Sequence, residues 1–76
     1  FMITLDQLGA GCSARICKVR CKGRLRRRLM DMGLVRGMPI EMVKKAPLGD
    51  PVEYHLCGYH LSLRQSEAQC IEIDMS

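Results

Sequence analysis

The sequence has few aromatic side chains. Its 76 residues include no Trp, one Phe and two Tyr. Grooves that bind proline-rich peptides and surfaces that stack nucleic-acid bases are both built from aromatic rings. The composition therefore argues against both kinds of site.

Long apolar segments are also missing. No run approaches the roughly 18 residues that a membrane-spanning helix needs, and no apolar signal-peptide stretch is seen. A soluble, cytoplasmic protein is therefore expected, with Met2 as the native start and Phe1 as an added residue. Any association with the inner face of the membrane would then be peripheral, through a partner.

The residue sets that enzymes use are missing as well. There is no G-x-x-x-x-G-K-[ST] phosphate-binding segment, and no Ser-His-Asp or Cys-His set has a supporting context. A chain of this length hides only about 60% of the surface that its unfolded form exposes, which leaves little room for a deep catalytic cavity. We expect a single domain over residues 1–76 that is not an enzyme, has no small-molecule substrate and needs no cofactor.

The cysteines are odd in number and include no C-x-x-C pair. Without a secretory signal, such a set argues against a disulfide framework. We expect reduced thiols that pack as small hydrophobic groups, with no disulfide required for folding. The five positions are Cys12, Cys17, Cys21, Cys57 and Cys70.

Positive charge is concentrated in the first part of the chain. Residues 1–28 hold eight Lys or Arg against one acid, a charge of +7, whereas residues 29–76 hold four against seven, a charge of −3. Such a stretch is a candidate contact for phosphate, anionic headgroups or an acidic protein surface. The alternative is a solvated basic face that serves only solubility.

The hydrophobic pattern predicts mostly short strands and one helix. Leu25, Leu29 and Met32 fall on one helical face, so a helix is expected over residues 24–32, with Gly33 in the left-handed position that ends it. Strand patterns occupy residues 14–20, 39–45, 52–57, 60–63 and 70–74, and a short helical turn is expected over residues 64–69. These elements describe a mainly β fold: a small SH3-like, partly open barrel of five to six strands.

One hairpin can be registered from the sequence. Gly58-Tyr59 suits a two-residue type II′ turn, which would place Cys57 opposite His60 and Tyr54 opposite Leu63. The alternation then puts Tyr54 and Leu56 on the buried face and leaves His55 more exposed.

Several segments together resemble the ferrous iron transport protein A family, FeoA. They are RLMDMGLVRG at residues 28–37, APLGDP at 46–51, LSLRQSEA at 61–68 followed by IEI at 71–73, and TLDQL at 4–8. The resemblance implies a cytosolic SH3-like domain that binds and modulates or assembles FeoB, the membrane ferrous iron transporter, from its cytosolic side. FeoA-like domains also end iron-dependent repressors, but this chain looks like the free-standing accessory because it has no room for a DNA-binding domain.

Two surfaces are the predicted partner-binding sites: the basic helix with its exit, and the loop between two strands. Leu48 is expected to be exposed at the loop tip. For Gly33, Gly49 and Pro47, a role in backbone geometry alone is the alternative. The predicted residues are Arg26, Arg27, Arg28, Leu29, Gly33, Leu34, Pro47, Leu48, Gly49, Asp50 and Pro51.

Three alternatives stay open at this point. His55, Cys57 and His60 are weak candidates for a zinc or iron site, adventitious or regulatory, although they lie outside the family pattern and no fourth ligand is placed. A nucleic-acid-binding barrel of the iron-repressor type would use the basic stretch for phosphate contacts, but no aromatic residue falls within it. A homo-oligomer is also compatible with the sequence.

Overall fold

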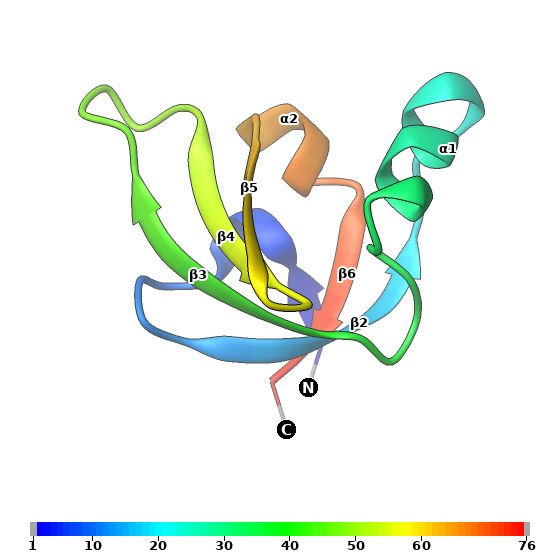
Figure 1. Cartoon of the computed structure of the whole chain (residues 1–76), viewed down its shortest axis with the longest axis horizontal. Helices are drawn as coiled ribbons and strands as arrows, with labels where there is room; N and C mark the ends of the chain where they lie inside the picture. The colour runs from blue at the N-terminus through cyan, green and yellow to red at the C-terminus, as the bar shows by residue number, and fades with distance from the viewer. Residues whose placement is uncertain (1, 76) are drawn as a thin grey trace.

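The chain folds into a strongly curved sheet with two helices at one end (Figure 1). The computed structural model describes residues 2–75, so Phe1, the expected added residue, lies outside the described part. The elements are β1 (Met2–Thr4), the 3-10 helix η1 (Leu5–Gln7), β2 (Ser13–Val19), α1 (Gly23–Asp31), β3 (Pro39–Lys45), β4 (Val52–Leu56), β5 (Tyr59–Leu63), α2 (Gln65–Ala68) and β6 (Ile71–Asp74). The predicted mainly β class, with one main helix, is confirmed.

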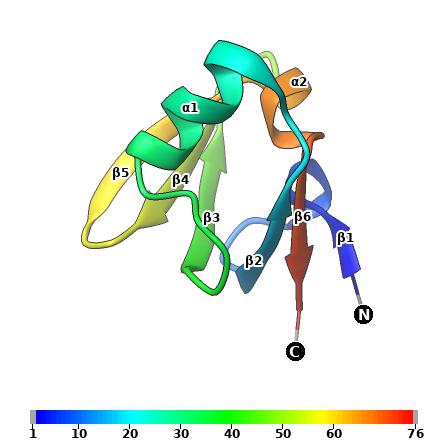
Figure 2. The same ribbon diagram turned by 90° about the vertical axis from the view of Figure 1, so that its right-hand side faces the viewer.

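All strand pairs are antiparallel, and the order across the sheet is β1-β6-β2-β3-β4-β5. Figure 2 shows the strands side by side in this order, with α1 crossing one end. The sheet is not closed, because β1 and β5 form its two edges. The predicted partly open barrel is therefore confirmed. Its two edge strands, β1 and β5, do not pair with each other.

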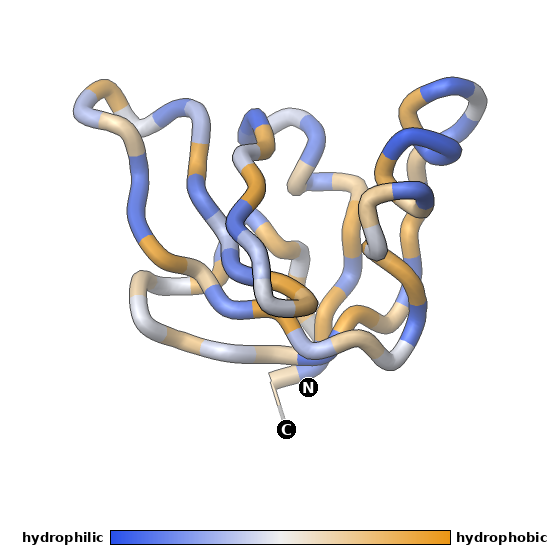
Figure 3. The backbone as a smooth tube through the Cα atoms, viewed as in Figure 1, coloured by the Kyte–Doolittle hydropathy of each residue, from blue (hydrophilic) through white to orange (hydrophobic). Residues whose placement is uncertain are grey.

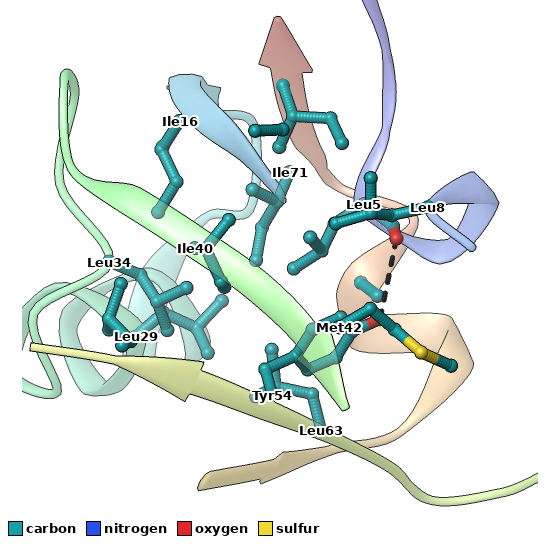
Figure 4. Packing of buried hydrophobic residues seen from close by; sticks show 14 of the residues in the cluster. Leu5, Leu8, Ile16, Leu29, Leu34, Ile40, Met42, Tyr54, Leu63 and Ile71 are labelled. Atoms are coloured by element: carbon teal, nitrogen blue, oxygen red, sulfur yellow. Dashed lines mark hydrogen bonds between the residues drawn. The ribbon is translucent and has the colours of Figure 1, made fainter. Parts of the chain in front are cut away.

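The concave side of the sheet holds the core (Figure 4). Along β4, the buried residues Val52, Tyr54 and Leu56 alternate with half-buried ones, as predicted from the period of two. From α1, Leu29 inserts fully into this core, while Leu25 and Met32 are partly buried against it. The helix itself begins at Gly23 and has Met32 as its C-cap, within one residue of the predicted bounds.

A bulge in β2 explains its irregular hydrophobic spacing. The pairing of β2 with β6 shifts between Ile16 and Lys18, so Cys17 is an extra residue in the strand. Ile16 and Val19 both face the core although they are three positions apart. A strict period of two could not have placed both side chains inside.

The predicted register of the β4–β5 hairpin is wrong by one pair. The turn residues are Cys57 and Gly58, whose φ values of 53° and 80° correspond to a type I′ turn. His55 therefore lies opposite His60, and Tyr54 lies opposite Leu61. Moving the turn by one residue changes every partner but leaves each side chain on the same face, so the predicted burial of Tyr54 and Leu56 is confirmed. Hydrophobic alternation alone cannot separate these two registers.

The expectation that all five thiols are reduced is also wrong. Cys21 and Cys70 form a disulfide with their Cα atoms 5.4 Å apart, a separation typical of such bonds. The bond joins the segment before α1 to the residue before β6. Cys12, Cys17 and Cys57 are free.

Tyr54 is the buried titratable group of the core. Its hydroxyl donates a hydrogen bond to the carbonyl oxygen of Leu5 at 3.4 Å (Figure 4). Burial raises the pKa of Tyr54 from 10.0 to about 12, and the Asp6 carboxylate acts in the same direction. The neutral phenol is thus the form that the folded state favours.

This shift has a consequence for stability at alkaline pH. Below pH 10 the phenol is neutral in both states, whereas between about pH 10 and 12 it ionises only in the unfolded chain. The free energy of unfolding is therefore expected to fall over that interval, by up to about 2–3 kcal/mol for this group. Urea unfolding at pH 9, 10 and 11 measures the effect. Tyr54→Phe should lose this part of the slope and the control Tyr59→Phe should keep it; equal slopes in all three proteins would contradict the assignment.

Candidate interaction surfaces

The loop from β3 to β4 presents one apolar side chain to solvent. Leu48 is 97% exposed, as predicted, at the tip of this loop. The tube in Figure 3 shows a hydrophobic segment at the same tip, between hydrophilic stretches. An apolar side chain this exposed contributes nothing to the core, so a contact with another molecule would be a gain of burial.

Hydrogen bonds fix the loop beneath Leu48. The Gly49 amide donates to the carbonyl of Ala46 at 2.7 Å, and Gly49 has a positive φ of 90°. The side-chain amide of Gln65 donates to the Gly49 carbonyl at 2.6 Å, and the backbone N–H of Gln65 donates to Asp50 Oδ1 at 2.9 Å. Gly49 and Asp50 therefore join the loop to the start of α2. Their polar groups hold the tip in place.

A shallow hollow lies beside the loop tip. It has a volume of about 360 Å³ and combines the rigid rings of Pro47 and Pro51 with the side chains of Lys44, Lys45 and Glu53. Ala46 and Ser62 complete its lining. The predicted residue Pro47 is exposed here. The exposed side chain of Leu48 therefore lies next to a depression that is lined by residues of both charges.

The arginines of α1 fall into two groups. Arg26 donates to the Val19 carbonyl at 2.8 Å, and Arg28 forms an ion pair with Glu67 of α2 at 2.9 Å. These two contacts attach the helix to β2 and α2. Within the described part of the chain, Arg27 makes no hydrogen bond or ion pair, so its charge faces solvent.

Three residues of the predicted helix surface have structural positions. Leu29 and Leu34 are each 0% exposed, so their side chains belong to the core and cannot contact a partner. Gly33 has a φ of 99°, the left-handed conformation predicted for the helix end. A Cβ at that position would lie 3.5 Å from both Leu56 Cδ2 and the Tyr59 hydroxyl.

The two predicted surfaces do not form one patch. Figure 1 shows the β3–β4 loop and α1 at opposite ends of the longest axis, with β5 and α2 between them. The Cα trace extends 30 Å along that axis. A partner that contacts both must therefore span the molecule along its longest axis.

The three weak metal candidates are not brought together as predicted. His55 and His60 face each other with ring centroids 5.0 Å apart, but Cys57 lies in the turn beside Met38, 3.3 Å between sulfur atoms. His60 Nδ1 is 4.0 Å from Glu53 Oε2. Residues 2–75 contain no group of three or more His, Cys, Asp or Glu side chains placed to hold a metal ion.

A basic hollow is the feature that sequence reasoning missed. The side chains of Lys18, Arg20, Lys22 and Arg26 line a depression of about 560 Å³ where β2 leads into α1. The concentration of positive charge was visible in the sequence, but its gathering around one depression depends on the angle between β2 and α1.

Over residues 2–75, no helix is both long enough and apolar enough to cross a membrane.

Comparison with known proteins identifies the family. The model of the FeoA domain matches residues 3–75. The chain belongs to the FeoA family. The FeoA domain is a non-enzymatic accessory domain, which agrees with the prediction that the chain is not an enzyme.

One curated relative joins two proteins in a single chain. It is the Fe(2+) transport protein A/Fe(2+) transporter FeoB fusion protein of Porphyromonas gingivalis, 41% identical over 71 residues. The match covers 93% of this chain but only 8% of that protein.

Solved structures agree with this assignment. The FeoA protein of Chlorobium tepidum, determined by NMR, is 41% identical, with a TM-score of 0.90 over 96% of this chain and 70% of that one. The zinc-complexed FeoA of Stenotrophomonas maltophilia, described as an SH3-domain protein, is 32% identical, with a TM-score of 0.84 over 95% and 89% of the two chains. The predicted SH3-like fold and FeoA resemblance are both confirmed.

Proposed function

We propose that this chain is an accessory module of ferrous iron transport that binds the cytosolic part of a FeoB-type membrane transporter. The observation that carries the proposal is the P. gingivalis fusion, in which an FeoA-type segment and a FeoB transporter share one polypeptide. Linking two proteins raises their effective concentration, which is useful when they act on each other.

The β3–β4 loop is the proposed anchor. Leu48 offers apolar area, and the hydrogen bonds from Gln65 to Gly49 and Asp50 already hold its backbone. A preorganised loop loses little conformational entropy on binding. The exposed charge of Arg27, at the other end of the molecule, would act mainly on the rate of encounter with an acidic partner.

The proposal is tested by binding to the immobilised cytosolic part of the transporter, with and without GTP. Leu48→Ala is expected to raise the dissociation rate and weaken binding about tenfold, as the loss of an apolar anchor does. Leu48→Met is the matched control, because it keeps an apolar side chain of similar size, and it should bind like the unmodified protein. Thermal stability should be unchanged in both variants, since this side chain is 97% exposed.

The outcomes separate the surface from the function. Unchanged binding by Leu48→Ala would place the interface elsewhere while leaving the accessory role intact. If the unmodified chain neither binds the transporter nor supports iron uptake in cells that lack their own accessory protein, the proposed function fails.

Metal binding is not part of this proposal. The S. maltophilia protein is described as complexed with zinc. In this chain the described residues offer no group of three or more metal-binding side chains. The donor set therefore does not fit a resident zinc ion.

A further inference from the structure

We propose that the basic hollow, lined by Lys18, Arg20, Lys22 and Arg26, binds the phosphoryl group of an anionic ligand. The proposed transporter contact does not use this hollow, and the inference does not depend on that contact. The evidence is the juxtaposition of four cationic side chains around one depression of about 560 Å³. Among residues 2–75, no acidic side chain lines it.

Most of this positive charge is not neutralised within the protein. In the described part of the chain, no carboxylate pairs with Lys18, Lys22 or Arg26. Arg20 is paired with Glu72 at 2.8 Å. The hollow therefore presents three cations that form no ion pair among the described residues, and an anion would relieve the repulsion among them.

The walls of the hollow are fixed before any ligand arrives. The Arg20 amide donates to the Cys70 carbonyl at 2.6 Å, and Cys21, which also lines the hollow, is bonded to Cys70. On the other side, Arg26 is held by the Val19 carbonyl at 2.8 Å. A rigid frame lowers the entropy cost of binding, while the two lysines keep the freedom to adjust to the anion.

The chemistry of the lining favours phosphoryl oxygens over a nucleobase. Arg and Lys donate charge-assisted hydrogen bonds to phosphate oxygens, with Arg suited to two oxygens at once. Tyr54 and Tyr59, the aromatic residues of the described part of the chain, do not line the hollow, so it offers no ring among residues 2–75 for a base to stack on. Gly23, which begins α1, is also at the hollow, and the first turn of α1 contains no acidic side chain.

The phosphoryl group could come from a soluble di- or triphosphate or from a phospholipid headgroup. Both share the same chemistry, and two probes distinguish them: pyrophosphate, and vesicles of phosphatidylglycerol compared with vesicles of phosphatidylcholine. Amide signals of the 15N-labelled protein report where pyrophosphate binds, and vesicle co-sedimentation reports headgroup binding.

The test variant is Lys18→Gln with Lys22→Gln, which leaves the structural contacts of Arg20 and Arg26 intact. Its dissociation constant is expected to rise about tenfold for whichever phosphoryl probe binds. The matched control is Lys44→Gln with Lys45→Gln, which removes the same charge at the far end of β3 and should change binding less than about twofold.

Each outcome decides the matter. Binding of pyrophosphate, of phosphatidylglycerol vesicles or of both, with signals of residues 18–26 perturbed and affinity lost only in the test variant, supports the proposal and names the source. Equal weakening by the control would reduce the effect to net charge and overturn the site. Failure of both phosphoryl probes to bind, or equal binding to phosphatidylcholine, would overturn it as well.

Discussion

Reduction of the Cys21–Cys70 disulfide is expected to lower the melting temperature of the protein by about 15–25 °C. The bond closes a loop with a sequence separation of 49 residues. A cross-link over that length removes conformational entropy from the unfolded chain and stabilises the folded state by about 3–4 kcal/mol. Thermal melts followed by circular dichroism, with and without reductant, measure the difference.

The free cysteines provide the control. Cys12→Ser with Cys17→Ser and Cys57→Ser leaves the disulfide in place, so this variant should still lose stability on reduction. Cys21→Ser with Cys70→Ser should melt at the same temperature with or without reductant. If reduction leaves the melting temperature of the unmodified protein unchanged, the bond does not contribute to stability, and the expectation that folding requires no disulfide would hold.

The disulfide could not be predicted, because its two residues meet only in the folded sheet. Cys21 follows β2 and Cys70 precedes β6, and the pairing of these strands brings both ends together. Local spacing carries no information about such a pair. By contrast, the bounds of α1 and β3 follow from periodicity and turn residues within a few positions, and the structure places both elements within one residue of expectation.

The hairpin shows a second kind of limit. The burial of Tyr54 and Leu56 follows from alternation, which the sequence displays directly. The partners of His55 and His60 depend instead on which two residues form the turn, and Cys57 adopts a positive φ that its side chain does not favour. With His55 opposite His60 and Cys57 in the turn, residues 2–75 hold no group of three or more metal-binding side chains, so the structure does not support the metal-site hypothesis.

The candidate surfaces divide along the same line. The exposure of Leu48 was predicted because Pro47 and Gly49 place it at a turn tip, and no long-range packing was needed. The roles of Arg26 and Arg28 depend on the Val19 carbonyl and on Glu67, which only the fold brings near. Contacts between segments that are distant in the sequence therefore determine which arginine side chains of α1 are held within the protein and which are available to a partner.

Leu29 belongs to the segment at residues 28–37 that resembles the FeoA family, and its side chain stabilises the fold. Its side chain is 0% exposed and packs from α1 into the core. Leu29→Ala is expected to lower the free energy of unfolding by about 3 kcal/mol, because the substitution removes buried apolar contacts and leaves a cavity. The neighbouring residue Met30 is the matched control: it lies on the exposed side of the same helix, so Met30→Ala should stay within about 0.5 kcal/mol of the unmodified protein.

Binding measurements on the same variant distinguish a core residue from a contact residue. At a temperature where Leu29→Ala remains folded, its affinity for the transporter should stay within about twofold of the unmodified value, because an enclosed side chain has no surface to offer. Leu48→Ala should behave in the opposite way, with weakened binding and unchanged stability. Denaturant unfolding and the binding assay are applied to both variants. Leu29→Ala should change only the free energy of unfolding, and Leu48→Ala should change only the affinity. A Leu29→Ala protein with normal stability and weakened binding would show that the motif is a contact surface after all, and would contradict the packing described for α1.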